Sequence, residues 1–462
     1  MRIPAVVKTS VKFGLLVMLL LVGLGVSIVT PIDRRPYQEQ KFFKETLRRL
    51  DSLESIQLLF QADTFLVGWS EVDITPDHQG PLAGYGGRKP KTFETIADSI
   101  AIRTIVFNNG NKKLAFITAD LLVIHPELSE EVYQNLPRGW SRNDIFFMAT
   151  HSHSSIGGWA PGFVGNLFAG DFDPEVVKLL SSKIVTSLSL AENAQAEGYV
   201  SFNELQVPEL VKNRLVGEQG KIDPWLKILG LMSADATGFL SIYGAHATCL
   251  SRHYRNLSGD YPGVFNRIVK NMEGVSFSAF AAGAVGSMGP IVEKNEDERL
   301  EAFQFGHLLS ENIQLLQLLS PEYIQDLKIG SFHLDLALPE PQLKLSTNLC
   351  LRPWIFRHLM GDYPVNISVA MIGKNLFIGL PCDFSGELAV PLYEFARSNQ
   401  INLTITSFNG GYLGYIIKDD WYDLDKYEAR TMSWYGPDAG SYLSAIMERI
   451  IIYAASQTYG YD

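Results

Sequence analysis

The chain has 462 residues and a net charge of −11 at neutral pH, and 46% of its residues are hydrophobic. This composition is typical of a folded protein with a substantial core. No stretch is basic enough to follow a phosphate backbone, which argues against nucleic-acid binding. Three cysteines are too few for a disulfide framework or a cysteine-rich zinc module, and no glycine-rich loop followed by Lys-Ser or Lys-Thr indicates a bound nucleotide.

The N-terminus combines basic residues with a long apolar run. Arg2, Lys8 and Lys12 precede twenty uncharged residues at 13–32. Twenty helical residues span about 30 Å, which is the thickness of a bilayer core. We therefore predict a cytoplasmic basic segment at 1–12 and a transmembrane anchor, or a signal segment, at 13–32. No Ala-x-Ala site follows the run, which favours an anchor, with the rest of the chain outside the cytoplasm, either periplasmic or extracellular.

Beyond the apolar run, the sequence predicts a helical stalk at 33–62 and a catalytic domain at 63–462. Within that domain, strand-like and helix-like patterns alternate along the chain. Hairpins are predicted at 100–122, 226–248 and 369–381, a buried strand at 144–150, and helices at 173–195, 296–318 and 442–457. This mixture predicts an α/β fold in which mixed β-sheets, built from hairpins and buried strands, are covered by helices.

Histidines at strand ends are the first candidate site residues. His151 and His153 follow the buried strand 144–150, and His246 ends another apolar strand. Alternate residues of a strand share a face, so His-x-His can present two imidazoles to one metal. A single strand-end histidine is more often structural, but two such sites in one chain are more suggestive of a metal than either alone.

Carboxylates near predicted strand ends could complete a metal site. Asp120, Asp260 and Asp383 occupy such positions, although each could equally be a helix cap or a turn residue. A zinc hydrolase needs about three protein ligands and an open position for water or substrate. His151, His246 and Asp383 could supply those ligands, but their spacing alone does not select them.

Seven segments follow one another in the order found in a known family. They are VGWSEVDITP with GPLAGYGGR, TADLL, ATHSHSSIGG, Lys212-Asn213-Arg214, the stretch from His246 to Asp260, LPCDFSGEL, and YIIKDDWYDLDKYEARTMSWYGP. Together, over residues 67–453, they resemble the catalytic domain of the neutral (non-lysosomal) ceramidases, which are zinc amidases. The resemblance implies hydrolysis of the N-acyl amide of ceramide, or of a similar N-acyl lipid, to a fatty acid and an amine.

The same resemblance implies a role for each candidate residue. The implied zinc ligands are His151, His246, Asp383 and Tyr415, with Glu387 as an alternative to Asp383. The implied catalytic residues are Arg214 and Tyr427 at the oxyanion, His153 as a proton-handling residue or a support behind the ligands, and Ser287 as a nucleophile. Zinc would polarise the amide carbonyl or lower the pKa of water, and tyrosine and arginine donors would stabilise the oxyanion.

One segment departs from the family pattern. The family carries its nucleophilic serine in Gly-Asp-Val-Ser-Pro-Asn, whereas this chain has GAVGSMGP at 283–290. Ala284 replaces the aspartate, Gly286 occupies the serine position, and Ser287 is one position late. Either Ser287 reaches the zinc through a rearranged loop, or water activated by zinc attacks directly. The departure also leaves two alternative functions open. The chain could be a related zinc hydrolase that acts on another amide or ester, or a non-catalytic metal-binding protein with the same scaffold.

Overall fold

The computed structural model describes residues 13, 23, 25, 27–54, 57–61, 64–89, 91–234, 236–319, 321–323 and 328–460. The predicted segment 1–12 and most of the predicted anchor at 13–32 lie outside these residues, so both stay predictions there. The end of the predicted span is different from the expectation, because Val29–Pro31 form a β-strand that pairs with Leu349–Leu351 of the domain instead of continuing a membrane helix. Within the described part of the chain, no helix has the length and apolar character that crossing a membrane requires.

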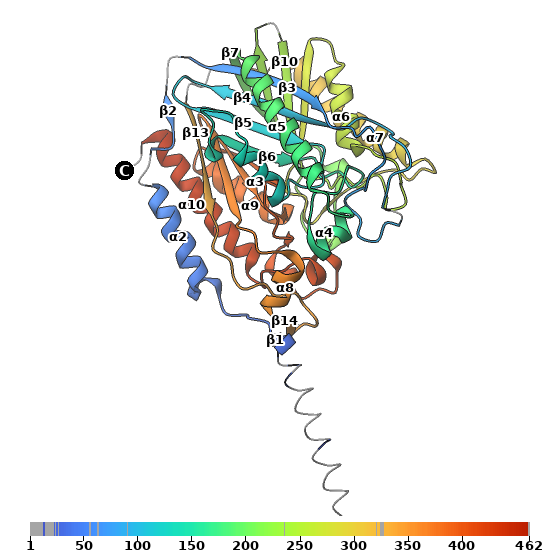
Figure 1. The fold of residues 1–462 in the computed structure, drawn as a ribbon. Helices are drawn as coiled ribbons and strands as arrows, with labels where there is room; N and C mark the ends of the chain where they lie inside the picture. The colour runs from blue at the N-terminus through green and yellow to red at the C-terminus, as the bar shows by residue number, and fades with distance from the viewer. Residues whose placement is uncertain are drawn as a thin grey trace, which may run out of the picture.

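Two β-sheets packed face to face, with helices on both outer sides, build four layers (Figure 1). As far as the chain is described, the larger sheet has eight strands in the order β11-β10-β9-β7-β3-β4-β5-β6, and the smaller has five in the order β18-β16-β15-β13-β2. Parallel pairs (β5–β6, β10–β11 and β16–β18) occur among antiparallel ones. The predicted α/β fold of mixed sheets covered by helices is therefore confirmed.

The elements have the following bounds. The larger sheet contains β3 Leu66–Asp73, β4 Ala101–Asn108, β5 Lys113–Ala119, β6 Ile145–Ala149, β7 Ala196–Gln206, β9 Trp225–Ser233, β10 Ala236–Tyr243 and β11 Val275–Ala282. The smaller contains β2 Phe60–Gln61, β13 Lys328–Asp335, β15 Asn366–Ile372, β16 Asn375–Leu380 and β18 Asn402–Ser407. Short pairs join β1 Val29–Pro31 with β14 Leu349–Leu351, β8 Val211–Asn213 with β12 Met288–Pro290, and β17 Asp383–Phe384 with β19 Tyr415–Ile416.

Helices cover both outer faces of the sheet pair. The larger sheet carries α3 Pro126–Gln134, α5 Pro174–Asn193, α6 Asp260–Lys270 and α7 Glu298–Leu318. The smaller carries α2 Lys41–Glu54, α9 Gly386–Ser398 and α10 Ala439–Tyr459. Two further short helices, α4 Gly162–Ala169 and α8 Pro353–Met360, contact each other at one end of the domain (Figure 1).

Alternation along the strands explains the layers. In β5, Leu114 and Phe116 point into the core between the two sheets, where they join Phe377 of the smaller sheet. Ala115 and Ile117, one residue out of step, face the side chains of α3 and α5. A strand with apolar residues on both faces must be covered on both sides, and this strand lies between the second sheet and a helical layer.

The hairpins, the buried strand and the helices predicted from the sequence are all present in the structure. The three predicted hairpins are β4–β5, β9–β10 and β15–β16, all antiparallel, and the buried strand is β6. The three predicted helices are α5, α7 and α10. The helix predicted between the apolar run and the domain is α2, and it packs against α10 with Leu50 fully buried.

Candidate metal centre

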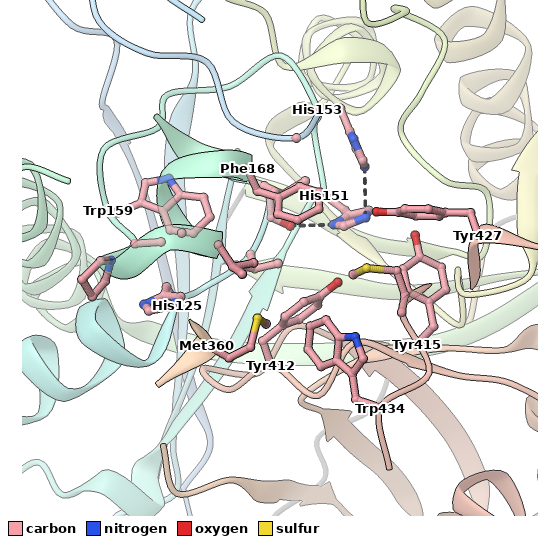
Figure 2. A pocket seen from close by; sticks show the side chains of 18 residues that line it. His125, His151, His153, Trp159, Phe168, Met360, Tyr412, Tyr415, Tyr427 and Trp434 are labelled. Carbon is pink, nitrogen blue, oxygen red and sulfur yellow. Dashed lines mark hydrogen bonds between the residues drawn. The ribbon is translucent and has the colours of Figure 1, made fainter. Parts of the chain in front are cut away.

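The side chains of His151, His153 and His246 meet beside a pocket, where segments that follow separate strands come together. Figure 2 shows the first two of these histidines among the residues that line the pocket. His151 and His153 follow β6, and His246 follows β10. The Nε2 atom of His151 lies 2.9 Å from Nε2 of His246 and 3.2 Å from Nε2 of His153. Since these ligand atoms lie within 4.8 Å of one another, the predicted histidines form a candidate metal site.

Two backbone carbonyls fix the tautomers of His151 and His246. Nδ1 of His151 lies 2.6 Å from Leu122 O, and Nδ1 of His246 lies 3.2 Å from Val285 O. A carbonyl oxygen only accepts hydrogen bonds, so each Nδ1 carries the proton and donates. Each Nε2 is therefore left with its lone pair, and the two lone pairs face each other across 2.9 Å. A cation beside both nitrogens would relieve this repulsion, and histidines oriented through their second nitrogen are typical of metal sites.

Burial keeps two of the histidines, His153 and His246, in the neutral form that binds metals. Burial lowers the pKa of His153 and of His246 well below the usual imidazole value, because a charged ring is poorly solvated there. The nearby positive charge of Arg214 lowers both pKa values further. The rings are thus ready to donate lone pairs at neutral pH.

The backbone at His151 is held in an uncommon conformation. Its φ is +61°, in the left-handed region that few residues other than glycine occupy. The imidazole stacks on the ring of Phe408, with ring centres 4.1 Å apart and an angle of 11° between the planes. The stacking and the bond to Leu122 O fix the ring, and strain of this kind is concentrated at functional sites.

Asp383 and Tyr415 bring oxygen atoms to the same point. They face each other as partners in the parallel pair β17–β19. Asp383 Oδ1 lies 3.4 Å from Nε2 of His151 and 3.8 Å from Nε2 of His246, and the Tyr415 hydroxyl lies 3.3 Å from Nε2 of His246. Asp383 Oδ2 accepts a hydrogen bond from Tyr412, whereas the buried Oδ1 receives none from any described residue. An unpaired, buried carboxylate oxygen beside two imidazole lone pairs fits a bound cation.

Arg214 and Tyr427 lie next to this cluster. Arg214 donates a hydrogen bond of 2.9 Å to the Tyr415 hydroxyl, and its Nε lies 3.1 Å from a carboxylate oxygen of Glu428. Tyr427 begins a short π-helical turn, Tyr427–Thr431, and its ring centre lies 6.2 Å from that of Tyr415. Tyr427 is 48% exposed and lines the pocket. The structure thus brings both predicted oxyanion residues to the site.

Two other candidates point elsewhere. The Ser287 hydroxyl is fully buried and lies 2.6 Å from the hydroxyl of Ser385, and Ser287 is not among the residues that line the pocket. The Glu387 carboxylate accepts hydrogen bonds from the Trp421 indole at 3.1 and 3.3 Å. Of the two carboxylates considered from sequence, Asp383 is therefore the one that faces the histidines.

The pocket beside the histidines is apolar. Figure 2 shows the eighteen side chains that line it, among them Trp159, Phe168, Met360 and Trp434. None of the eighteen, all of them described residues, is a lysine, arginine, aspartate or glutamate. His151, His153 and tyrosine hydroxyls lie at one end, and His125 lies apart from them beside Trp159, among mainly hydrocarbon walls. This arrangement suits a ligand with one polar group and a long apolar part.

Backbone groups hold the site in ways that side-chain patterns do not reveal. Leu122 O and Val285 O orient the metal-site histidines, and the Arg214 N–H donates to Ser287 O at 2.8 Å. The altered segment 283–290 therefore positions His246 and Arg214 through its carbonyls. The TADLL motif was the one sequence signal that pointed to Leu122. A motif match cannot show that the backbone carbonyl of this residue is the group that orients His151.

Asp120 and Asp260 have structural roles. Asp120 is fully buried and accepts hydrogen bonds from Ala101 N at 2.9 Å and from Arg103 at 2.8 Å, so it supports the start of strand β4 and does not cap a helix. Asp260 is also fully buried and accepts bonds from Tyr261 N and Leu250 N. Neither carboxylate belongs to the histidine cluster.

Asp260 is expected to make stability depend on pH. Burial raises the pKa of its carboxyl to about 7, from 3.8. The folded state therefore keeps a proton that the unfolded chain releases, so unfolding free energy falls as pH rises from about 4 to about 7, by about 4 kcal/mol in total. Asp260→Asn should remove this slope, because asparagine stays neutral and tolerates the φ of +55° found here. Urea unfolding of both variants between about pH 4 and about pH 7 measures the slope, and the exposed Asp77→Asn is the control that should keep it. The prediction would be wrong if Asp260→Asn kept the wild-type slope as well.

The sequence matches known proteins over about half of its length. Residues 65–299 match the family described as neutral/alkaline non-lysosomal ceramidase, N-terminal. A neutral ceramidase of Mycobacterium tuberculosis is 24% identical over an alignment of 258 positions, which covers 49% of this chain and 40% of that protein. A neutral ceramidase of Pseudomonas aeruginosa is 23% identical over an alignment of 245 positions, which covers 48% of this chain and 36% of that protein. The matches thus span two fifths or less of these relatives.

Solved structures share the fold more widely. The crystal structure of neutral ceramidase from Pseudomonas aeruginosa has a TM-score of 0.72 and 17% identity, and the match covers 85% of this chain and 74% of that one. A ceramidase complexed with C2 has the same TM-score and identity and is covered over 75% of its length. The structural match supports a common fold beyond residue 299. With the family match covering just over half of its length, the chain belongs to the neutral/alkaline non-lysosomal ceramidase family.

Proposed function

We propose that the protein is a zinc-dependent amidohydrolase that cleaves the N-acyl amide of ceramide, or of a similar N-acyl lipid, to a fatty acid and an amine. One observation carries the proposal: two buried imidazoles present opposed Nε2 lone pairs at 2.9 Å, next to the unpaired Oδ1 of Asp383. Family membership supports the hydrolase chemistry, and nitrogen and oxygen donors of this kind suit zinc.

We assign His151, His246, Asp383 and Tyr415 as the zinc ligands. The first two histidines each donate their Nδ1 proton to a carbonyl, which is the usual support for a ligating imidazole. Nδ1 of His153 has no hydrogen-bond partner among the described residues, although its Nε2 reaches the same cluster. His153 also lines the pocket, so we assign it to proton transfer between the substrate and the solvent side of the site.

The remaining polar residues would act on the substrate carbonyl. When bound, zinc polarises the amide carbonyl and lowers the pKa of water. Tyr427 lines the pocket, where its hydroxyl can donate to the developing oxyanion. Arg214 donates to Tyr415 and is held by Glu428, so it fixes the tyrosine hydroxyl and adds positive charge beside the reacting carbonyl.

The pocket favours a lipid over a charged amide. Its lining consists of aromatic, aliphatic and methionine side chains around the histidine end, without any charged Lys, Arg, Asp or Glu among its described residues. An N-acyl amino acid would bring a carboxylate that these walls do not neutralise, whereas a long acyl chain would gain about 0.8 kcal/mol for each methylene that leaves water. The uncharged run 13–32 supports a membrane anchor that would hold the domain beside such a substrate, outside the cytoplasm.

Release of fatty acid from ceramide by the full chain tests the proposal, with a short soluble amide and an ester measured alongside. Ceramide is expected to be the best of the three substrates. Faster turnover of the amide or the ester would instead indicate a related hydrolase. Absence of turnover on all three, in folded and zinc-loaded protein, would indicate a non-catalytic protein.

Ser287→Ala is expected to keep turnover within about twofold of wild type. Its hydroxyl bonds with Ser385 and is absent from the pocket lining, so we propose water as the nucleophile. The lost hydrogen bond should cost stability of about 1 kcal/mol. Ser385→Ala removes the same bond from the other side and is the control for activity, although it also removes the hydrogen bond from Glu387 N that caps α9 and should therefore cost more stability. If Ser287→Ala lost a hundredfold or more in activity while Ser385→Ala did not, a covalent mechanism through Ser287 would replace water attack.

A further inference from the structure

Helix α4 has two apolar faces. Val164 and Phe168 line the pocket on its inner side. Phe163 and Leu167, four residues apart and thus on one face, are 68% and 40% exposed on its outer side. A short helix with hydrocarbon on both sides forms the wall between the pocket and the surroundings, and its outer face stays partly exposed to solvent.

The exposed apolar surface continues onto the neighbouring elements. Helix α8 contacts α4, and a Cβ added at Gly162 would lie 3.7 Å from Leu359 O. Trp354 at the start of α8 is 58% exposed, Leu345 before β14 is 45% exposed, and Leu349 at the start of β14 is 43% exposed. We call the exposed side chains at this end of the domain the apolar rim: Phe163, Leu167, Leu345, Leu349 and Trp354.

The apolar rim adjoins the end of the uncharged N-terminal run. Strand β1, Val29–Pro31, pairs with β14 in the antiparallel direction. The Trp354 indole donates to Ser27 O at 3.1 Å, and Arg352 N donates to Ile28 O at 2.8 Å. Figure 1 shows α4, α8, β14 and β1 gathered at one end of the domain. The run predicted to enter the bilayer therefore ends on the elements that carry the apolar rim.

We propose that the apolar rim is a membrane-docking surface that seats in the headgroup region of a lipid bilayer and opens the pocket towards it. Phenylalanine, leucine and tryptophan are the side chains that favour this region, and Trp354 presents one polar and one apolar part as interfacial tryptophans do. A lipid substrate then passes from the bilayer along α4 into the pocket without its chains crossing water. The route for substrate rests on the proposed function, but the docking itself does not.

Site-specific labelling tests the docking directly. The native cysteines are all buried, with exposures of 1% or less, so an introduced surface cysteine can be labelled alone with an environment-sensitive fluorophore. Phe163→Cys reports on α4 and Leu345→Cys on the segment before β14. Leu190→Cys is the matched control, because it is 49% exposed and lies sixteen residues along α5, about 24 Å from that helix's start near α4.

The full-length labelled proteins are reconstituted into phosphatidylcholine vesicles without substrate. Labels at 163 and 345 are expected to shift to the blue and to lose emission when nitroxide-labelled phospholipid is included, while the label at 190 does neither. Equal behaviour of all three labels would overturn the proposal. So would a shift at 163 that grows with protein concentration and needs no vesicles, because a second copy would then cover the rim. Docking without ceramide hydrolysis would contradict only the proposed function.

Discussion

Replacing His151 with alanine is expected to abolish metal binding and to lower hydrolysis of the amide by about a thousandfold or more, since a bound metal contributes several kcal/mol of transition-state stabilisation. His151 is central to the cluster: its Nε2 lies 2.9 Å from His246, 3.2 Å from His153 and 3.4 Å from Asp383. Without the His151 imidazole, the side chains of His246, His153 and Asp383 no longer surround one candidate metal position. Metal content and initial rate on the same preparation measure both effects.

The control for this variant is His78→Ala, which removes an exposed histidine from a loop. It should retain the metal and the activity of the wild type. Circular dichroism on both variants shows whether the fold is kept. Loss of metal with retained hydrolysis in His151→Ala would contradict the proposed mechanism, because the chemistry would then not depend on the metal centre.

Gly286→Ser is expected to lower the stability and the metal affinity of the protein, although it places a serine where the sequence resemblance implies the nucleophile of the family. A Cβ at Gly286 would lie 2.3 Å from the backbone oxygen of Asp383 and 2.9 Å from the carbonyl carbon of Phe384. Backbone cannot yield as a flexible side chain does, so we expect a loss of stability of about 3 kcal/mol. Since Asp383 must move, metal affinity should also fall about 10- to 100-fold.

Gly87→Ser is the matched control, because a Cβ there meets nothing within 4 Å. Its unfolding free energy should stay within about 0.5 kcal/mol of wild type. Thermal or urea unfolding together with metal titration compares the two variants. A Gly286→Ser protein that gained activity at unchanged stability would show that the segment 283–290 can hold a serine nucleophile after all.

Predictions from local pattern succeeded where the controlling interactions are local. The hairpin β4–β5 follows from two β-rich runs around an asparagine- and glycine-rich turn, and the helix α5 follows from apolar periodicity. Local pattern could not decide whether α2 would stand apart from the domain as a stalk or pack against it. Its contact with α10 joins residues about 400 positions apart, and no local signal encodes such a partner.

In the candidate metal centre too, the local sequence predicted some features, whereas the tertiary packing determines others. His151 and His246 could be proposed because each follows an apolar strand, but the 2.9 Å between their Nε2 atoms depends on the packing of separate segments. Asp383 could be chosen over Glu387 only once the structure showed where each side chain points, since the Glu387 carboxylate accepts a hydrogen bond from Trp421. The orienting carbonyl of Val285 could not be found from side-chain identities, because any residue supplies a carbonyl.

We propose that the histidine cluster holds a zinc ion that the amide chemistry requires. Metal analysis of the purified full-length protein, paired with a ceramide-hydrolysis assay before and after chelation, tests it most directly. We predict one equivalent of zinc per chain, loss of fatty-acid release on its removal, and recovery when zinc is returned. Folded protein that contains no metal and binds none when titrated with zinc would contradict the account.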